Sequence, residues 1–329
     1  MATRKKKNPF ALIKPLLEDP EVTEIMIDGI QRVTIEKQGK IEDTGLHFPS
    51  EDAVKAMVKE TLKMAGMDLE EGKTIYDVRV TDNSRMLAVL SPTSINGHNV
   101  AFRKWMKHQI SWEKLLEYQS LSAEVRDLIQ RALHAHVSVL IAGGTASGKT
   151  TFANRVIELI PADERVVVVE QTHELQFDHP LSIFLEADGA VRTPINDLLT
   201  AGSKMRPDWL VIGELHGAEA LHALQLMGNG HSAISTMHAT NAENALLRLE
   251  ALCLTANLGL GMDEIRQTIV SGLRLIAYQE RLPNGYRKVV QLVELKGLEE
   301  GRYVLQPLMR YNAEKDTFEM TGVKPSWEE

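Results

Sequence analysis

The sequence predicts an α/β fold in which a doubly wound, largely parallel sheet follows a smaller α+β N-terminal domain. Three observations support this prediction. The chain has 329 residues, which is more than one ordinary hydrophobic core accommodates. In its second half, continuous apolar runs alternate with helical patterns, as in parallel sheets that are covered on both faces. A glycine-rich stretch at residues 143–151 joins one such run to one such helical pattern.

The first 105 residues are predicted to form the α+β domain. A short amphipathic helix covers residues 9–18, and a longer helix begins after Ser50, a suitable N-cap, and stops at Gly66. Alternating apolar and polar residues predict strands at 23–28, 32–36, 86–90 and 99–102. Residues 106–119 are polar and less regular, so we expect a linker there and a second domain over residues 120–329.

The second domain is predicted to alternate helices with strands. Helical spacing favours helices over residues 123–136, 152–160, 194–205 and 218–227. Apolar, β-branched runs favour strands over residues 137–142, 165–170, 209–213 and 233–237. Such sheets bind ligands beyond the carboxyl ends of their strands, so polar residues at those ends are the first candidates for function.

Residues 143–151, Gly-Gly-Thr-Ala-Ser-Gly-Lys-Thr-Thr, fit the phosphate-binding pattern G-x-x-x-x-G-K-[ST] at every position. The glycines allow backbone N–H groups to surround an anion, and the helix that follows adds the partial positive charge of its N-terminus. In this pattern Lys149 reaches the β- and γ-phosphates, and the hydroxyl of Thr150 is a ligand of Mg²⁺. We therefore expect a nucleotide to be bound by Gly144, Thr145, Ala146, Ser147, Gly148, Lys149, Thr150 and Thr151.

Residues at three further strand ends suit phosphoryl transfer. Glu170 and Glu174 follow one apolar run, and Glu214 follows the next. Transfer of a phosphoryl group to water needs a carboxylate that orients or deprotonates the nucleophile. His238 follows a third strand, where an imidazole can hydrogen-bond to a γ-phosphate. One isolated glutamate would more often be a solvated charge or a salt-bridge partner, but acidic residues that end two strands beside a phosphate loop favour a functional role.

The composition excludes several other classes of protein. No apolar run approaches the roughly 18 residues of a membrane-spanning helix, and no signal-peptide pattern opens the chain, so we expect a cytoplasmic protein. The single cysteine, Cys253, excludes an intrachain disulfide and a thiolate zinc site. A net charge of −8 argues against non-specific coating of nucleic acid, and no direct nucleic-acid binding is expected.

Five motifs, taken in order, resemble those of the secretion ATPase superfamily, the hexameric motors of type II and type IV secretion, conjugation and type IV pili. They are Walker A at 143–151, the aspartate box at 170–175, the MRPD motif at 205–208, Walker B at 212–215 and the histidine box at 230–239. Residues 16–26 and 241–252 also resemble the family. The resemblance implies a RecA-like P-loop NTPase core that uses ATP and Mg²⁺.

The resemblance also implies roles for single residues. Glu174 is implied to be the catalytic glutamate of the aspartate box and Glu214 the Walker B glutamate, with Lys149 and His238 also in the catalytic set.

In this family the nucleotide lies between the two domains, and arginines of the N-terminal domain reach its phosphates. Arg85 and Arg103 match those positions, and Arg206 matches the MRPD arginine. An arginine delivered by a moving domain neutralises transition-state charge only on closure.

Two positions depart from the family pattern. Gln171 stands where an acidic residue is usual, and His216 stands where the Walker B segment usually has arginine. Histidine is largely neutral near pH 7, so the second change removes a permanent cation. Since Lys149, Glu174 and Glu214 are in place, we still expect an active ATPase.

Within the family, the chain most resembles the motors of tight-adherence pili, because residues 280–287 and 318–325 look like the C-terminal strands of that group. The four cysteines of the zinc-bearing type II motors are absent. The implied function is a homohexameric ring motor that powers pilus assembly or secretion. Its implied partner is a platform protein at the inner membrane, where the cytoplasmic ring is peripheral.

Alternatives stay open. Conjugation and type IV secretion motors, which transfer DNA, are also similar. Gln171 and His216 would suit a nucleotide-dependent scaffold that hydrolyses ATP weakly. A P-loop kinase acting on a small molecule is disfavoured, because no second substrate pocket or lid segment is recognisable.

Overall fold

The computed structural model describes residues 8–37, 40–80, 84–105, 110–188 and 192–328. The chain divides into two compact units, with the division between His108 and Gln109. Within the linker predicted over 106–119, residues 106–109 lie outside the described part of the chain, and Trp112–Glu117 forms helix α3. The polar sequence of this segment does not predict the helix. The hydroxyl of Ser111 caps it, and Leu115 is its only buried residue.

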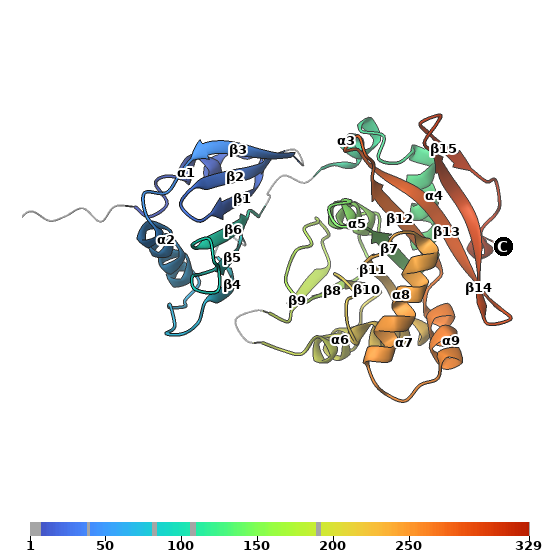
Figure 1. Cartoon of the computed structure of the whole chain (residues 1–329). Coiled ribbons are helices and arrows are strands. Elements are labelled where there is room, and N and C mark those ends of the chain that lie inside the picture. The colour runs from blue at the N-terminus through green and yellow to red at the C-terminus, as the bar shows by residue number, and fades with distance from the viewer. Residues whose placement is uncertain (1–7, 38–39, 81–83, 106–109, 189–191, 329) are drawn as a thin grey trace, which may run out of the picture. The chain divides into compact units, whose positions relative to one another are not determined.

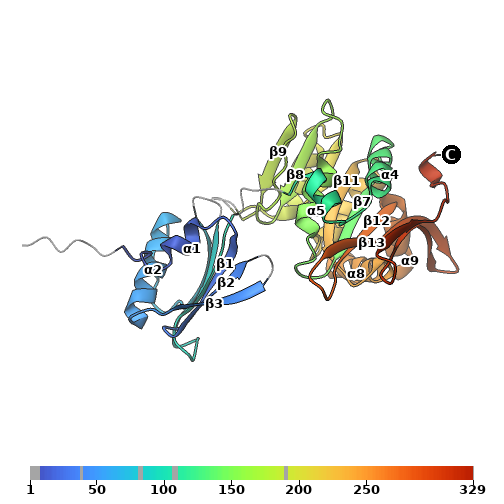
Figure 2. The same cartoon turned by 90° about the horizontal axis from the view of Figure 1, so that it is seen from above.

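The N-terminal unit is an antiparallel sheet with helices α1 and α2 on one of its faces (Figures 1 and 2). The strand order is β3-β2-β1-β6-β5-β4. The helices are α1 (Lys14–Glu18) and α2 (Glu51–Met64), and the strands are β1 (Val22–Asp28), β2 (Arg32–Lys37), β3 (Lys40–Leu46), β4 (Ile75–Arg79), β5 (Arg85–Val89) and β6 (Asn99–Arg103). The predicted N-cap is confirmed, because the hydroxyl of Ser50 accepts the N–H of Ala53.

Strands β3 and β4 are missing from the sequence prediction. Both are edge strands, at opposite ends of the sheet order. No residue of β3 is buried, so it lacks the apolar alternation that would predict a strand. It forms through its pairing with β2, and β4 pairs with β5 in the same way.

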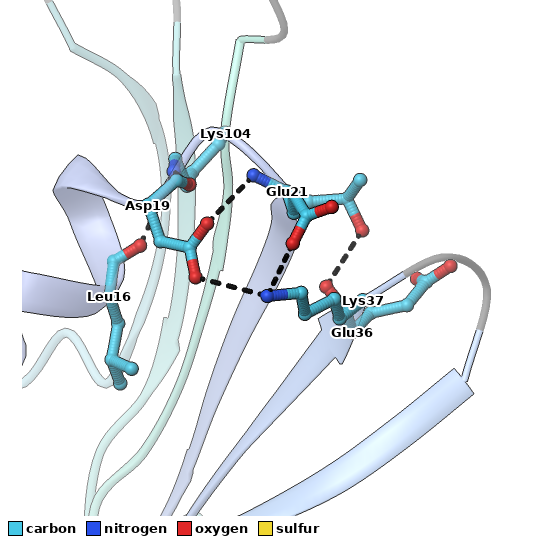
Figure 3. A network of polar contacts seen from close by, with 7 residues as sticks. Leu16, Asp19, Glu21, Glu36, Lys37 and Lys104 are labelled. Atoms are coloured by element: carbon cyan, nitrogen blue, oxygen red, sulfur yellow. Dashed lines mark hydrogen bonds and ion pairs between the residues drawn. The ribbon is translucent and has the colours of Figure 1, made fainter.

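A polar network ties together α1, β1, β2 and the end of β6 (Figure 3). The ammonium of Lys104 donates to the backbone carbonyls of Leu16 and Asp19. The ammonium of Lys37 lies 3.4 Å from the carboxylate of Asp19 and 2.6 Å from that of Glu21. The hydrogen bond to Glu21 raises the pKa of Lys37 above its ordinary value. These contacts fasten α1 to the sheet.

The C-terminal unit is a nine-stranded sheet within the described residues, in the order β15-β14-β13-β12-β7-β11-β10-β8-β9. From β12 to β9 the neighbours are parallel, whereas β13, β14 and β15 extend the sheet by antiparallel pairing. The strands are β7 (Val139–Gly143), β8 (Val166–Glu170), β9 (Ser182–Glu186), β10 (Trp209–Ile212), β11 (Ser232–His238), β12 (Leu275–Arg281), β13 (Arg287–Glu299), β14 (Arg302–Asn312) and β15 (Thr317–Met320).

Helices cover both faces of this sheet (Figure 1). The helices are α4 (Ala123–His134), α5 (Lys149–Ile157), α6 (Ile195–Ser203), α7 (Glu219–Gly228), α8 (Ala242–Thr255) and α9 (Met262–Gly272). Helices α3, α4 and α5 pack on one face, against Val166, Val168 and Val211. Helices α6 to α9 pack on the other, against Val167 and Val169. Because successive residues are buried on opposite faces, the strands read as continuous apolar runs, and the predicted α/β architecture is confirmed.

The sequence prediction is incomplete at the end of the chain. Residues 280–287 are not continuous strand, because β12 ends at Arg281 and a turn precedes β13. Of residues 318–325, only 318–320 belong to β15. Strands β9 and β14, most of β12 and β13, and helix α9 are additional; β9 is an edge strand without a fully buried residue. No helix in the described ranges is both long and apolar enough to span a membrane.

Candidate functional site

The predicted phosphate loop connects the end of β7 at Gly143 to the start of α5 at Lys149. Gly148 is the N-cap of α5 and has φ +92°, and Ala146 has φ +57°. Glycine adopts the left-handed region without penalty, whereas a residue with a Cβ is uncommon there. The backbone of the loop is therefore wound tightly ahead of a helix N-terminus, which is a suitable arrangement for binding an anion.

The loop carries an unused hydrogen-bonding group. The hydroxyl of Ser147 is almost fully buried, and it has no hydrogen-bond partner among the described residues. A buried polar group without a partner costs about 1–3 kcal/mol, so such groups are rare and concentrate at functional sites. Of the other predicted binding residues, Thr145 and Ala146 are exposed, and Gly144, Gly148, Thr150 and Thr151 are half-buried.

Lys149, His238 and Glu214 form a chain of contacts across three neighbouring strand ends. The ammonium of Lys149 donates to the carbonyl of Gly144 at 2.9 Å and lies 3.2 Å from Nδ1 of His238. Nε2 of His238 lies 3.2 Å from Oε1 of Glu214. Because an ammonium only donates hydrogen bonds, Nδ1 accepts and the ring proton is assigned to Nε2, facing Glu214.

Glu174 belongs to the same electrostatic environment. Burial lowers the pKa of Lys149 from its ordinary value, and the negative charges of Glu214 and Glu174 oppose that shift. Lys149 is buried, whereas the side chain of Glu174 is exposed. The structure therefore brings four predicted catalytic residues, Lys149, His238, Glu214 and Glu174, to the carboxyl edge of the parallel strands.

Two residues that the sequence prediction missed pack against the phosphate loop. Gln279, two residues before the end of β12, is paired in register with Gly143, and its Oε1 is buried without a hydrogen bond within the described residues. Nε of Arg287, at the start of β13, donates to the carbonyl of Ala146 at 3.0 Å. The Cδ of Arg287 also occupies the space beside Gly148. No local pattern marks either residue, because each reaches the loop through the pairing of β7, β12 and β13.

Arg85 and Arg103 lie in the N-terminal unit, opposite each other on β5 and β6. Nε and Nη2 of Arg85 bind the two carboxylate oxygens of Asp77, each at 2.6 Å. Arg103 is also paired in register with Glu24 of β1. Burial raises the pKa of Glu24, and the charge of Arg103 opposes that shift. The predicted role of both arginines stays a prediction.

Arg206 is not brought together with the four clustered residues within this chain. It precedes β10, at the amino-terminal edge of the parallel strands, while Glu214 follows the other end of that strand. The four residues of β10 span about 13 Å. Arg206 is exposed and has φ +55°, and its role also stays a prediction.

The two departures from the family pattern have partners in the structure. Nε2 of Gln171 donates to the carboxylate of Asp188 at 2.8 Å, and the hydroxyl of Thr172 donates to its other oxygen at 3.3 Å. The half-exposed ring of His216 lies 3.8 Å from Oε1 of Glu219. That oxygen also accepts the backbone N–H of His216. Where an acidic residue is usual in the family pattern, Gln171 therefore supplies an amide N–H that donates to Asp188.

Magnesium fits the residues at this edge of the sheet. Mg²⁺ at nucleotide sites keeps several waters and binds one or two protein oxygens together with substrate phosphates. Thr150 supplies a half-buried hydroxyl in the first turn of α5. Glu214 supplies a carboxylate whose Oε1 is buried and lies 3.2 Å from Nε2 of His238. No group of three or more His, Cys, Asp or Glu side chains suited to a metal is found in the described residues.

Comparisons with known proteins place the chain among secretion proteins. The family described as type II/IV secretion system protein matches residues 6–292. The conjugal transfer protein TrbB of Rhizobium radiobacter is 26% identical over 292 residues, covering 87% of this chain and 88% of that protein. An uncharacterized protein of Methanocaldococcus jannaschii is 27% identical over 323 residues, covering 96% of this chain; the chain spans only 58% of that relative's length.

Among solved structures, the pilus retraction motor PilT with bound ADP shares the fold. Its TM-score is 0.60 at 19% sequence identity, over 90% of this chain and 80% of that one. The family match extends over most of the chain and includes the phosphate loop, the glutamates at the strand ends, and both of the residues that pack against the loop from β12 and β13. The chain therefore belongs to the type II/IV secretion system protein family.

Proposed function

We propose that this protein hydrolyses ATP to ADP and phosphate, and that the reaction drives a pilus-assembly or type II/type IV-like secretion machine. The observation that supports the proposal best is the convergence of Lys149, His238, Glu214 and Glu174 beside the phosphate loop. A buried cation, two carboxylates and a wound loop at a helix N-terminus are the groups that phosphoryl transfer to water requires.

In this proposal each group has a separate task. The loop N–H groups and the side chain of Lys149 bind the phosphates. The negative charge of the phosphates favours the protonated form of the buried Lys149 amine. Glu174, whose side chain is exposed, accepts the proton of the attacking water. Thr150 and Glu214 hold Mg²⁺, which neutralises phosphate charge when bound. His238 holds Glu214 and Lys149 in register through its two ring nitrogens.

The proposal extends to the assembly. The motor is a homohexameric ring in the cytoplasm, peripheral at the inner membrane, and its partner is a platform protein of the pilus or secretion machine. Arg85, Arg103 and Arg206 contribute positive charge to the phosphates in that ring. The exposed position of Arg206 at the amino-terminal edge of the strands suits a contact with a neighbouring subunit better than one within its own.

A second candidate is a motor of conjugal DNA transfer. The similarity to the conjugal transfer protein TrbB over most of both chains supports it. Copurification tests which products of the neighbouring genes bind this protein and so separates the two candidates. Platform and pilin proteins indicate a pilus, and relaxase or channel proteins indicate conjugation.

The test of hydrolysis is steady-state release of phosphate from Mg-ATP by the full chain, beside Glu174→Gln. The matched control is Glu243→Gln, which removes an exposed carboxylate from the first turn of α8. We expect turnover by the parent and the control, and loss of about 100-fold or more in Glu174→Gln with ATP still bound. Light scattering in each nucleotide state reports ring formation.

The outcomes separate a motor from a scaffold. Binding of ATP without turnover by the parent, also in the presence of membranes, would contradict the hydrolysis and favour a nucleotide-dependent scaffold. Equal turnover by the parent and Glu174→Gln would remove Glu174 from the catalytic role.

A further inference from the structure

We infer that Glu170 is a positioning residue that holds the segment carrying Glu174 in place and braces it against the segment carrying Glu214. The inference rests on the proposed ATP hydrolysis. Glu170 is the last residue of β8, and its side chain is almost fully buried, at 3% exposure.

The carboxylate of Glu170 is fully used within the loop that follows it. Oε1 accepts the backbone N–H groups of Glu174 and Leu175, both at 2.9 Å. Oε2 lies 2.8 Å from Nδ1 of His173. A buried carboxylate is costly unless such donors surround it, and hydrogen bonds to a charged acceptor are stronger than neutral ones. The negative charge therefore folds residues 171–175 around itself.

The same side chain also packs against the segment that carries Glu214. A Cβ added to Gly213 would lie 2.7 Å from Cγ of Glu170 and 3.1 Å from its Oε1. The backbone N–H of Gly213 donates to the carbonyl of Val169 at 3.0 Å, which fixes the two segments side by side. Glycine at position 213 thus leaves the space that the carboxylate of Glu170 occupies.

This arrangement separates the role of Glu170 from that of a catalytic base. Its oxygens are occupied by protein donors and shielded from solvent, so it is not placed to accept a proton from water. One of its hydrogen bonds goes to the backbone of Glu174 itself. A misplacement of about 1 Å at a reacting group can cost about 100-fold in rate, so loss of this hydrogen bond should affect turnover more than nucleotide binding.

The first test compares Glu170→Ala and Glu170→Gln with the parent. For Glu170→Ala we expect kcat to fall about 10- to 100-fold while the Kd for ATP, measured by direct titration, changes less than about twofold. Glu170→Gln keeps an acceptor at Oε1, so we expect it to recover most of the lost kcat. A loss of ATP affinity in proportion to kcat would overturn the inference, because it would indicate a general collapse of the site.

A second readout does not depend on activity. The amide protons of Glu174 and Leu175 are hydrogen-bonded to Glu170, so hydrogen exchange measured by mass spectrometry should speed up at residues 171–176 in Glu170→Ala and little elsewhere. Unchanged exchange in this segment would overturn the inference. If the parent itself does not hydrolyse ATP, the proposed function fails, and exchange alone decides whether Glu170 holds the loop.

Two further variants guard against misfolding as an explanation. Glu294→Ala removes another buried carboxylate, which accepts the backbone N–H of Ser326 and lies near the opposite end of β12; it should lower stability and leave kcat unchanged. Gly213→Ala displaces the carboxylate of Glu170 without removing it, and should lower kcat as Glu170→Ala does. Because both act through one contact, the double variant should lose little more than Glu170→Ala alone, whereas additive losses would contradict the shared contact.

Discussion

Substitution of Gly143 by alanine should destabilise the packing of the phosphate loop against the neighbouring strand of the sheet. Gly143 ends β7 and is paired in register with Gln279 of β12. A Cβ at this position would lie 2.4 Å from the carbonyl oxygen of Gln279, 2.5 Å from the hydroxyl of Ser147 and 3.2 Å from Cγ of Lys149. The nearest of these atoms belongs to the backbone of the neighbouring strand, so the strain cannot be relieved by a change of rotamer alone.

The magnitude follows from the nature of the contact. Overpacking of a well-packed interior costs about 1–3 kcal/mol, and for a domain of this size each kcal/mol lowers the melting temperature by about 2–4 °C. We therefore expect a decrease of about 2–12 °C in the transition of the C-terminal unit. Nucleotide affinity should fall as well, because Ser147 and Lys149 are both displaced.

The next residue provides a matched control. Gly144 has no neighbouring atom within 4 Å of an added Cβ, and neither glycine has a positive φ. Alanine at such a site stabilises by about 0.4–1 kcal/mol, because it restricts the unfolded chain. In the absence of nucleotide, the free energies of unfolding of the two variants should differ by at least about 1.4 kcal/mol.

The assay is differential scanning calorimetry of the full chain without nucleotide, which resolves transitions of separate units. Equal melting temperatures for Gly143→Ala and Gly144→Ala would refute the reasoning, because the two substitutions differ only in the space around the added carbon. A fall in the Gly144→Ala variant alone would place the close contact at the wrong residue.

Three further predictions concern single side chains. Burial lowers the pKa of Lys149 in the folded state, so between that pKa and 10.5 the unfolded chain binds more protons and the free energy of unfolding rises with pH. Urea unfolding at about pH 8 and about pH 10 should therefore show a larger rise in the free energy of unfolding for the parent than for Lys149→Met. An equal pH dependence of both proteins would contradict this. Burial raises the pKa of Cys253 to about 11, so a thiol reagent at neutral pH should label the folded chain at least about 100-fold more slowly than the chain in urea, and rapid labelling of the folded chain would contradict its burial. Arg287→Ala removes the hydrogen bond to Ala146 and should weaken ATP binding about 2- to 10-fold, as measured by direct titration. Arg310→Ala, on the exposed surface of β14, should leave ATP binding unchanged. Equal effects of the two substitutions would rule out a specific role of Arg287.

The phosphate loop shows how far local sequence reasoning reaches. A strand, five connecting positions and a helix are specified by neighbours in the chain, and the left-handed φ of Gly148 is a property that glycine supplies by itself. The same holds for helix α2, whose N-cap at Ser50 is a contact over three residues. The buried parallel strands β8 and β10 were predictable because both of their faces are apolar.

The edge strands mark the limit of that reasoning. β3 and β9 have no fully buried residue, so neither shows the alternation of buried and exposed positions that predicts a strand. They become strands because a neighbouring strand offers unpaired backbone groups. The sequence predicts a connector in place of helix α3 for a related reason, since this helix buries only Leu115.

The sequence by itself therefore determined the α/β architecture of the core and the phosphate loop. It also determined Glu174, Glu214 and His238 as candidates at the strand ends, and the resemblance to a family that the comparisons then established. Only the tertiary structure decided which distant residues share the site. Arg287 reaches Ala146, and Glu170 fits beside Gly213, because strand order and register set these contacts. Their physical origin is sheet pairing between segments far apart in the chain, which leaves no periodic signal at either residue.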